Sequence, residues 1–419
     1  MSKLIIKGGN RLSGETIVHG AKNSALPILA AALLVNGISV IHNCPDLSDV
    51  RASIKILQNL GCRCYRDGST VIVDARTVNC CEIPETLMRE MRSSIVFLGA
   101  VAARCKQAKL CSPGGCEIGP RPIDLHISSL KELGLAISEE HGCINCCCKA
   151  SGLVGNKVFL SIPSVGATEN IMIAAATAKG TTHIVNAARE PEIMDLADFL
   201  NKAGAKISGA GSSDIIIDGV ECLSSAEHTV IPDRILTATY LSAVALTGGD
   251  AVIKGVCKEH LEAVCSEYRK LGCKLRFCSN ELRVTAPQKL NRIKTVRTQY
   301  YPGFPTDAGP VLMAASAVAT GTSVFVETIF ENRFKFADEL NRMGADVKVE
   351  GRMAFVEGVD NLSAANVKCT DLRGGAALMV AATAALGTSE LNEIYHIDRG
   401  YETPEKYFKM LGADIERRE

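Results

Sequence analysis

The densest group of reactive side chains lies at residues 112–126, which read Ser-Pro-Gly-Gly-Cys-Glu-Ile-Gly-Pro-Arg-Pro-Ile-Asp-Leu-His. Three prolines and three glycines exclude a continuous helix or a central strand, because proline lacks a backbone donor and glycine is flexible. We therefore expect an exposed, mobile loop, followed by a helix that begins at Asp124. Cys116, Arg121 and His126 supply a thiol, a guanidinium and an imidazole, and we expect such a loop to close over a ligand. A surface turn with an incidental cysteine is the alternative.

A second chemical pattern is a set of cations placed where alanine-rich, buried helices are predicted to begin. Six such helices open near Lys22, Arg92, Thr168, Arg234, Asp307 and Arg373. A cation at a helix N-terminus interacts unfavourably with the helix dipole, so four cations in these places call for a partner. We expect an anion, a phosphate or a carboxylate, in a cleft between two domains. The alternative is that each long side chain extends to solvent.

The helices that position these residues belong to an internal repeat. In each copy an alanine-rich run ends in glycine and is followed by a β-type run and an amphipathic helix. The pattern is clearest at 174–205, 317–345 and 381–413, and it recurs at 24–61, 93–134 and 235–272. In the three clearest copies the amphipathic helices are predicted at 193–200, 334–343 and 404–411.

Six strand–helix–strand–helix–strand copies predict an α/β protein. Three copies around a pseudo-threefold axis would bury the alanine-rich helices and leave the sheets outside, which gives two inside-out α/β barrel domains of βαβαββ-type units. Residues 223–229 interrupt the periodicity. We therefore predict one domain at 22–229, which carries the cysteine loop 112–121, and a second at 1–21 with 230–419. The first strand, at residues 3–7, is expected to pair in the second domain.

Composition narrows the classes of partner. Lys plus Arg and Asp plus Glu both number 46 among 419 residues, so the formal net charge is zero. This argues against nucleic acid or a membrane surface as the main partner, since both favour a basic excess. No run of about 18 apolar residues is present, and the first nine residues lack the apolar core of a secretory signal. We expect a cytoplasmic protein.

The chain contains 18 cysteines, which we expect to be reduced thiols because no export signal is evident. Residues 143–148 read Cys-Ile-Asn-Cys-Cys-Cys. A Cys-x2-Cys step can begin a zinc site, but a second pair or a histidine group is needed. The alternation instead fits an outer strand of the second copy, so we expect no metal there.

Several motifs together indicate a family. They are Gly-Ala-Lys-Asn-Ser-Ala-Leu-Pro at 20–27, Pro-Gly-Gly-Cys at 113–116, Arg-Pro-Ile-Asp-Leu-His at 121–126, Ser-Val-Gly-Ala-Thr at 164–168, Ala-Arg-Glu-Pro-Glu at 188–192, Phe-Pro-Thr-Asp at 304–307, Phe-Glu-Asn-Arg at 330–333, Asp-Leu-Arg at 371–373 and Tyr-His-Ile-Asp-Arg-Gly-Tyr at 395–401. With them the chain resembles the enolpyruvyl transferases over its whole length. Within that family it resembles the members whose acceptor is UDP-N-acetylglucosamine.

The resemblance implies two inside-out α/β globes with the active site in the cleft between them. It implies transfer of the enolpyruvyl group of phosphoenolpyruvate to the 3′-hydroxyl of UDP-N-acetylglucosamine, with release of phosphate, as the first committed step of bacterial peptidoglycan precursor synthesis. No cofactor and no metal are expected, and the active species is expected to be a monomer.

The resemblance also assigns residues. Cys116 is implied as the general acid, and as the thiol that can form an adduct with phosphoenolpyruvate; a thiol suits this role because its pKa of about 8.5 leaves it mostly protonated at neutral pH. Asp307 is implied as the group that takes the proton of the acceptor hydroxyl. The alternative is that Asp307 is the N-cap of a helix, and the two roles can hold together. Glu190 and Arg234 are expected in an interdomain network, with a purely structural role as the alternative.

The remaining assignments are ligand contacts. For phosphoenolpyruvate the resemblance implies a phosphate clamp formed by Lys22, Arg121 and Arg399. It implies a carboxylate clamp formed by Arg333 and Arg373. It also implies that Asn23 contacts the reacting centre. The residues implied for UDP-N-acetylglucosamine are Arg92, Arg121, Pro122, Ile123, Asp124, Leu125, Ser164, Val165, Gly166, Asp307 and Ile329.

Two other functions are considered. A shikimate-3-phosphate enolpyruvyl transferase would share the fold and the phosphoenolpyruvate clamp, but the loop with Cys116 and the following Arg-Pro-Ile-Asp-Leu run argue against it. A catalytically silent paralogue that senses a nucleotide sugar is the second alternative, and the presence of Cys116, Asp307 and the arginines argues against that.

Overall fold

The computed structural model describes residues 2–111, 123–140, 142–149 and 152–419. These residues divide into two compact units, each with its own hydrophobic core. The first unit contains residues 20–111 and 123–231 of the described chain, and the second contains residues 2–19 and 232–419. Cys116, Arg121 and Pro122 lie outside the described residues.

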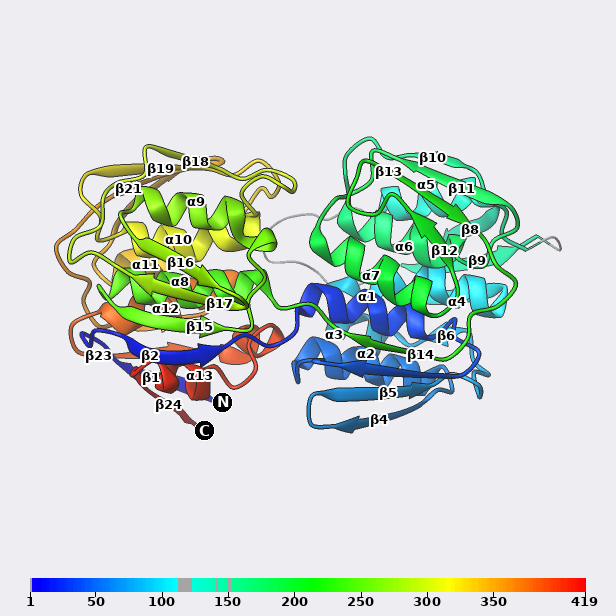
Figure 1. Cartoon of the computed structure of the whole chain (residues 1–419), viewed down its shortest axis with the longest axis horizontal. Helices are drawn as coiled ribbons and strands as arrows, with labels where there is room; N and C mark the ends of the chain where they lie inside the picture. Colours follow the sequence, from blue (N-terminus) through cyan, green and yellow to red (C-terminus); the bar gives the residue numbers. More distant parts are fainter. Residues whose placement is uncertain (1, 112–122, 141, 150–151) are drawn as a thin grey trace. The chain divides into compact units, whose positions relative to one another are not determined.

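The first unit has three four-stranded sheets (Figure 1). Their strand orders are β14 (Ala226–Thr229), β3 (Ile38–His42), β5 (Thr70–Asp74), β4 (Arg63–Asp67); β6 (Glu82–Ile83), β7 (Gln107–Cys111), β9 (Cys143–Cys148), β8 (Leu135–Glu140); and β10 (Lys157–Phe159), β11 (Thr181–Val185), β13 (Asp214–Asp218), β12 (Lys206–Ser208). The helices are α1 (Lys22–Ala32), α2 (Ser48–Asn59), α3 (Glu85–Glu90), the 3-10 helix η1 (Arg92–Val96), α4 (Phe97–Cys105), α5 (Asp124–Glu132), α6 (Val165–Ala175) and α7 (Pro191–Lys202).

The second unit repeats this plan. Its sheets have the orders β2 (Ser13–Ile17), β15 (Asp250–Lys254), β17 (Glu281–Thr285), β16 (Lys274–Cys278); β18 (Thr295–Arg297), β19 (Thr322–Val326), β21 (Met353–Glu357), β20 (Asp346–Glu350); and β22 (Asn366–Lys368), β23 (Thr388–Asn392), β1 (Lys3–Lys7), β24 (Asp414–Arg418). Its helices are α8 (Arg234–Leu246), η2 (Glu259–Leu261), α9 (Glu262–Lys270), η3 (Thr306–Ala308), α10 (Gly309–Ser316), α11 (Ala337–Arg342), α12 (Leu372–Ala384), η4 (Ile394–Arg399) and α13 (Pro404–Met410).

Within each unit the alanine-rich helices lie inside and the sheets lie outside, as predicted. In the second unit α8, α10 and α12 contact one another, and every residue of α8 and α10 is buried. A helix that is apolar on all sides is stable only when it is surrounded. Small residues permit close contact: in the first unit, a Cβ at Gly99 of α4 would lie 2.4 Å from the side-chain oxygen of Asn170 of α6. The strands alternate between buried and exposed residues, as in β13, where buried Ile215 and Ile217 alternate with exposed Asp214, Ile216 and Asp218.

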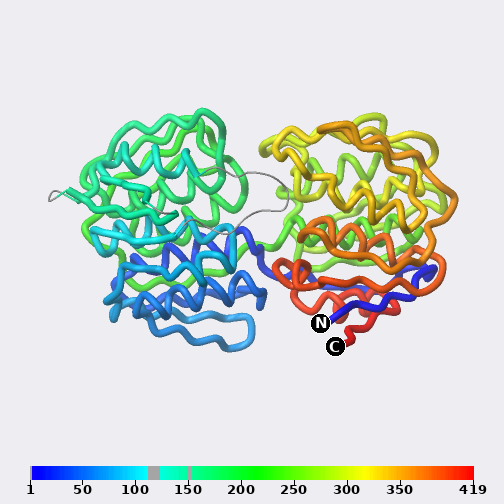
Figure 2. The backbone as a smooth tube through the Cα atoms, turned by 180° about the vertical axis from the view of Figure 1, so that it is seen from behind, coloured from blue at the N-terminus to red at the C-terminus, as the bar shows by residue number. Residues whose placement is uncertain are grey.

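Three of the six sheets contain a strand that is distant in the sequence from the rest (Figure 2). In the first unit β14 pairs in parallel with β3, and in the second unit β2 pairs in parallel with β15. The third case is β1, which lies between β23 and β24 and is antiparallel to both. The prediction that residues 3–7 pair in the second half of the chain is therefore confirmed.

Some predicted boundaries are wrong. The third buried helix begins at Val165 rather than near Thr168, because Ser164 acts as its N-cap. Arg92 opens a 3-10 turn, and the regular helix follows from Phe97. The amphipathic helix predicted at 334–343 is regular only over Ala337–Arg342. The strand predicted at Cys143–Cys148 is confirmed, and it lies between β7 and β8 in its sheet.

The idea that the helix-opening cations extend to solvent is wrong for three of them. Lys22, Arg234 and Arg373 are only 7%, 9% and 4% exposed. Burying a charge without a partner is strongly unfavourable. Each of these cations therefore needs counter-charges or polar partners; Asp49 is one for Lys22 and Asp307 is one for Arg373.

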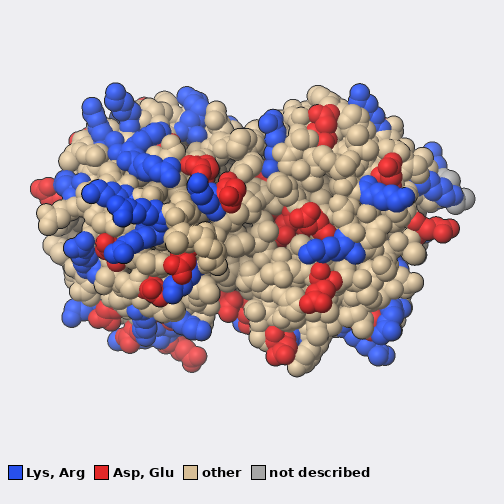
Figure 3. Space-filling view, viewed as in Figure 1, with Lys and Arg blue, Asp and Glu red and all other residues tan. Residues whose placement is uncertain are grey.

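Figure 3 shows basic and acidic side chains interspersed over the face drawn, in keeping with the zero net charge. None of the helices in the described part of the chain is both long enough and apolar enough to cross a membrane.

Candidate active site

In the second unit Asp307 forms an ion-pair cluster with two arginines. Its Oδ1 accepts a hydrogen bond from Nη2 of Arg333 at 2.5 Å, and its Oδ2 accepts from Nε and Nη2 of Arg373 at 3.2 and 3.0 Å. The arginine side chains are 2% and 5% exposed and the aspartate side chain 25%. The predicted proton acceptor and the predicted carboxylate clamp are thus one cluster.

The N-cap role considered for Asp307 is wrong. Asp307 lies inside the 3-10 turn η3, and the N-cap position of α10 is Ala308, which makes no side-chain cap. The caps of the neighbouring inner helices come from Asp233, for α8, and from Asp371, for α12. Asp307 is therefore held by the side-chain cations of Arg333 and Arg373.

Arg373 is fixed from several sides. Asp371 accepts from its backbone N–H at 3.0 Å, and its Nη1 donates to the hydroxyl of Tyr401 at 3.4 Å. That hydroxyl also contacts the hydroxyl of Thr239 at 2.9 Å. Burial lowers the pKa of Arg373, but the nearby charges, led by Asp307, outweigh it and raise the pKa above its ordinary value. The guanidinium stays charged and oriented for an anionic group.

Glu327 is a buried carboxylate that no pattern in the sequence predicts as a site residue. It is 2% exposed and follows β19 directly. Its Oε1 accepts from Thr298 Oγ1 at 3.0 Å and from the backbone N–H groups of Ile329 and Phe330 at 2.7 and 3.1 Å. Its Oε2 accepts from Thr306 Oγ1 at 2.8 Å. Glu327 therefore ties the turn that carries Asp307 to the turn that carries Ile329.

Glu327→Gln is expected to destabilise the protein by about 1–3 kcal/mol, because the amide nitrogen cannot accept the hydrogen bond that one carboxylate oxygen accepts now. Urea unfolding of the variant and the parent measures the difference. Glu331→Gln is the matched control, since Glu331 is an exposed partner of Arg352 at 3.5 Å and should change stability by less than about 0.5 kcal/mol. Equal stability of Glu327→Gln and the parent would contradict the role given to Glu327.

In the first unit Lys22 forms a buried ion pair. Its Nζ lies 2.7 Å from Oδ2 of Asp49, and the two side chains are 9% and 2% exposed. Asp49 lies in the first turn of α2, where the helix dipole favours a negative charge. Asn23, the next residue of α1, is half-buried. Asp49 was not identified from the sequence, because the pair joins two helices.

The first turn of α1 is held by a second buried carboxylate. Asp195 of α7 accepts a hydrogen bond from the hydroxyl of Ser24, and it contacts Nε2 of His228 at 2.8 Å. Its Oδ2 also accepts from the backbone N–H of Ile231 at 3.2 Å. This network fixes the end of α1 that carries Lys22 and Asn23.

The N-terminus of α6 gathers several of the residues assigned to the nucleotide sugar. Ser164 caps the helix by accepting from the N–H of Ala167 at 3.4 Å, and Val165 and Gly166 form the first turn. A Cβ at Gly166 would lie 3.0 Å from Cε1 of His126. The helix end therefore packs tightly on the imidazole, and its unpaired N–H groups suit an anion.

The imidazole of His126 is buried and hydrogen-bonded. Its Nδ1 contacts Nδ2 of Asn170 at 3.0 Å, and Asn170 also donates to the carbonyl of Ile95 and accepts from the N–H of Gly99. Burial, reinforced by the charge of Arg92, lowers the pKa of His126 from 6.5 to about 4, against a smaller opposing effect of Asp124. His126 is therefore neutral at pH 7.

This shift predicts a loss of stability in acid. Because His126 takes up a proton more readily in the unfolded chain, its contribution is complete above about pH 6.5 and is lost as the pH falls through 4. The full effect is about 3 kcal/mol. The free energy of unfolding is measured with urea at pH 7 and at pH 4.5. We expect it to fall less between these two pH values in His126→Gln than in the parent. His183→Gln, at an exposed ion pair with Asp214, is the control, and an equal loss in the parent and in His126→Gln would contradict the prediction.

The other assigned residues lie as follows. Ile123, Leu125, Ile329 and Arg399 are half-buried, and Asp124 is exposed at the start of α5, where the predicted helix begins. Glu190 is buried and accepts from the N–H of Arg189, while Arg234 lies 5.7 Å from the ring of Tyr301. Glu190 belongs to the first unit and Arg234 to the second.

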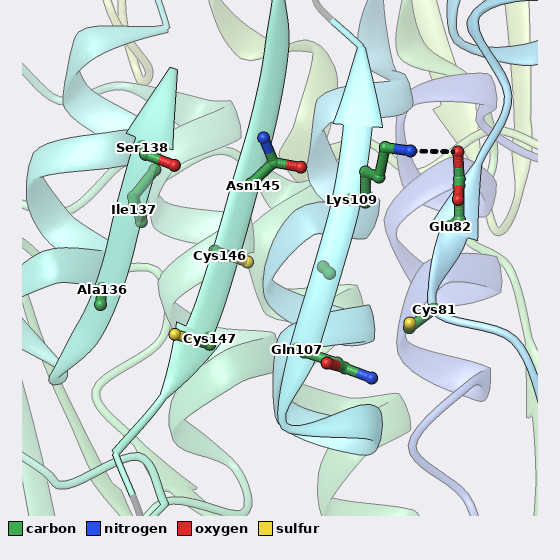
Figure 4. Close-up of a pocket in the computed structure, with 11 residues that line it drawn as sticks. Cys81, Glu82, Gln107, Lys109, Ala136, Ile137, Ser138, Asn145, Cys146 and Cys147 are labelled. Atoms are coloured by element: carbon green, nitrogen blue, oxygen red, sulfur yellow. Dashed lines mark ion pairs between the residues drawn. The ribbon is translucent and has the colours of Figure 1, made fainter. Parts of the chain in front are cut away.

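A hollow of about 490 Å³ lies on the sheet of β6, β7, β9 and β8 (Figure 4). Gln107 and Lys109 of β7 and Asn145 and Cys147 of β9 contribute to its lining, and Lys109 pairs with Glu82 at 2.9 Å. None of the residues assigned from the sequence lines this hollow. Within the described residues no group of histidines, cysteines and carboxylates is arranged to hold a metal ion.

Comparison with known proteins gives consistent results. The family model EPSP synthase (3-phosphoshikimate 1-carboxyvinyltransferase) matches residues 6–408. UDP-N-acetylglucosamine 1-carboxyvinyltransferase 2 of Caldanaerobacter subterraneus is 52% identical over 417 residues and covers 100% of both chains. UDP-N-acetylglucosamine 1-carboxyvinyltransferase 1 of Symbiobacterium thermophilum is 50% identical, covering 99% of this chain and 95% of its own.

Solved structures share the fold. The enolpyruvyl transferase NikO from Streptomyces tendae has a TM-score of 0.89 at 26% identity and covers 99% of this chain and 98% of its own. EPSP synthase from Acinetobacter baumannii has a TM-score of 0.77 at 17% identity, with full coverage of both chains.

Proposed function

This chain belongs to the EPSP synthase family of enolpyruvyl transferases, and from this we infer that it is a UDP-N-acetylglucosamine 1-carboxyvinyltransferase. It transfers the enolpyruvyl group of phosphoenolpyruvate to the 3′-hydroxyl of UDP-N-acetylglucosamine and releases phosphate. The observation that carries this inference is the identity of about half of all residues with relatives of that name over the full chain. Such an enzyme supplies the bacterial cell wall with its first committed peptidoglycan precursor.

The shikimate-3-phosphate reaction is the weaker candidate. The family model bears that name, but the solved EPSP synthase is 17% identical and supports the fold alone. The relatives at 45–52% identity bear the name of the UDP-N-acetylglucosamine enzyme.

The reaction adds an alcohol across a carbon–carbon double bond and then eliminates phosphate. In the first step the acceptor oxygen bonds to C2 of phosphoenolpyruvate, the hydroxyl loses its proton, and C3 gains one. In the second step C3 loses a proton and the C2–O bond to phosphate breaks, so the double bond forms again. We assign the proton donor for C3 to Cys116 and the acceptor of the hydroxyl proton to Asp307.

The cluster of Asp307, Arg333 and Arg373 supports a specific order of contacts. Both oxygens of Asp307 accept hydrogen bonds from guanidinium groups, and a substrate carboxylate would offer those groups the same bidentate geometry. In the absence of phosphoenolpyruvate, Asp307 accepts hydrogen bonds from the guanidinium groups of Arg333 and Arg373. We propose that the carboxylate of phosphoenolpyruvate, when bound, accepts some of these hydrogen bonds in place of Asp307. One aspartate oxygen is then available to the acceptor hydroxyl.

The remaining cations bind the phosphate of phosphoenolpyruvate. We assign Lys22, Arg121 and Arg399 to this role and Asn23 to the reacting centre. Lys22 is paired with Asp49, and this ion pair holds its ammonium group in place before the ligand binds. A preorganised charge of this kind needs little rearrangement in the transition state.

The nucleotide sugar is proposed to bind at the N-terminus of α6. Ser164, Val165 and Gly166 surround backbone donors that favour a diphosphate, and the charge of Arg92 acts on the neighbouring imidazole of His126. Arg121, Pro122, Ile123, Asp124, Leu125 and Ile329 complete the proposed set. We also propose that the enzyme acts as a monomer in the cytoplasm, which light scattering of the active fraction and cell fractionation test.

The deciding experiment measures phosphate release. The protein is incubated with phosphoenolpyruvate and either UDP-N-acetylglucosamine, shikimate-3-phosphate or no acceptor. We expect release only with UDP-N-acetylglucosamine. Release with shikimate-3-phosphate would support the sister reaction, and binding of the nucleotide sugar without any release would support a silent paralogue.

A further inference from the structure

Cys111 and Cys143 face each other across two antiparallel strands. Cys111 is the last residue of β7, Cys143 is the first residue of β9, and they occupy directly opposite positions in the ladder. Their sulfur atoms are 3.1 Å apart. Opposite residues of antiparallel strands have Cα atoms about 4.5–5.5 Å apart, which lies within the range of about 4.4–6.8 Å that a disulfide spans. A bond of about 2.0 Å therefore needs only a small shift of the two side chains.

The pair lies on the outer face of its sheet. In β7 Ala108 and Leu110 are buried, whereas Gln107, Lys109 and Cys111 alternate with them on the other face. In β9 Cys143 lies on the same side of the sheet as Asn145 and Cys147, and those two residues contribute to the lining of the hollow in Figure 4. Both thiols of the pair are partly exposed, so a small reagent can reach them.

Several other cysteines are also partly or fully exposed, but in the part of the chain that the structure describes they do not face another cysteine across a strand pair. Among the paired strands of the described residues, no other ladder position joins two cysteines. Cys146, also in β9, points to the core, and burial raises its pKa to about 12. The position of the pair, and not the abundance of cysteine, singles it out.

We propose that Cys111 and Cys143 form a reversible cross-strand disulfide, a modification site whose reaction partner is a low-molecular-weight disulfide such as oxidised glutathione. The thiolate of Cys143 attacks the reagent, a mixed disulfide forms, and one glutathione leaves. Cys111 then loses its proton, and its thiolate attacks the Cys143 sulfur and releases the second glutathione. Two protein thiols are oxidised, one glutathione disulfide is reduced to two thiols, and the two protons pass to the leaving sulfurs.

The order of the steps follows from the surroundings of the pair. The hydrogen bond between the two thiols, together with burial and the charges of Cys143 and Glu85, raises the pKa of Cys111 to about 11 against the opposing charge of Lys109. Either sulfur can donate this hydrogen bond; since the raised pKa of Cys111 favours its protonated form, we assign the first attack to Cys143. Glu140 lies opposite Cys143 on β8.

The bond would close a covalent loop over residues 111–143. Such a loop restricts the unfolded chain and stabilises the folded one. Within the sequence it encloses Cys116 and all of α5. The modification does not depend on the proposed function, because it needs only the sheet to be folded.

The test uses the full chain with oxidised glutathione, followed by alkylation of free thiols, digestion and mass spectrometry. We expect a cross-linked species that joins the peptides of Cys111 and Cys143, lighter than their sum by two hydrogens and split by dithiothreitol. The melting temperature of the oxidised protein should rise by several degrees. Cys111→Ser should abolish the cross-link and the rise, and should leave glutathione attached to Cys143.

Matched variants keep the test decisive. Cys147→Ser, at an exposed position two residues beyond Asn145, should leave the cross-link unchanged. Cys143→Ser provides a second variant in case Cys111→Ser folds poorly. The proposal is overturned if both cysteines are recovered alkylated on separate peptides, if each carries its own glutathione without a cross-link, or if Cys147 is the preferred partner of either.

Discussion

Replacing Asp307 by asparagine is expected to lower kcat by about 10²- to 10⁴-fold, the usual contribution of a positioned proton acceptor. Asparagine keeps the shape of the side chain but cannot take the hydroxyl proton. In the structure the carboxylate also holds Arg333 and Arg373. Because we propose that it competes with the substrate carboxylate for their guanidinium groups, we expect its neutral replacement to leave the affinity for phosphoenolpyruvate unchanged or to increase it. Steady-state kinetics and equilibrium binding measure both quantities.

This split between turnover and binding separates a chemical role from a structural one. Asp338→Asn removes the same charge from an exposed position of α11 in the same unit and should leave kcat within about twofold of the parent, as surface changes usually do. Circular dichroism and urea unfolding show whether Asp307→Asn is folded. A variant with unchanged kcat and weakened binding of phosphoenolpyruvate would mean that Asp307 only organises the arginines.

Replacing Cys116 by serine is expected to lower kcat by a similar factor, about 10²- to 10⁴-fold, because a hydroxyl is a far weaker acid than a thiol. The affinity for UDP-N-acetylglucosamine should remain nearly that of the parent, because the proposed nucleotide-sugar contacts do not include this side chain. Titration calorimetry of the nucleotide sugar and the phosphate assay measure the two effects. Full activity of Cys116→Ala would refute the acid role.

The same thiol can be identified chemically. Fosfomycin is an epoxide that mimics phosphoenolpyruvate, and we expect it to alkylate Cys116 through ring opening by the sulfur. Peptide mass spectrometry locates the added group, and Cys147→Ser is the control, since Cys147 is an exposed thiol of β9. A label on Cys147, or on any cysteine other than Cys116, would count against the assignment.

The local pattern of the sequence was sufficient for most of the fold. Runs of alanine and leucine that end in glycine predicted the inner helices, and α1, α8 and α12 begin within one residue of Lys22, Arg234 and Arg373. These positions are encoded locally, because a helix surrounded by other helices must be apolar on every side. The exact start of α6 was missed, because the cap formed by Ser164 took precedence over the apolar pattern.

The pairings inside the candidate site were not predictable in the same way. From the sequence, Glu327 is an ordinary polar residue after a strand. In the structure it accepts hydrogen bonds from Thr298, Thr306 and the backbone N–H of Ile329. Asp307 reads as a helix cap, yet it binds Arg373, which is 66 residues away. A hydrogen bond between distant segments depends on where the chain returns, and periodicity carries no information on that.

The sequence by itself determined the repeated α/β units, the cations at the starts of the inner helices and the family, because these depend on residue types and short spacings. The tertiary structure alone decided which strands complete each sheet, as when β14 joins β3 and β2 joins β15. It also decided that Lys22 is paired with Asp49 and that two cysteines meet across β7 and β9. The physical reason is that buried charges and facing side chains are selected by contacts between segments far apart in the chain, which form only when the units are folded.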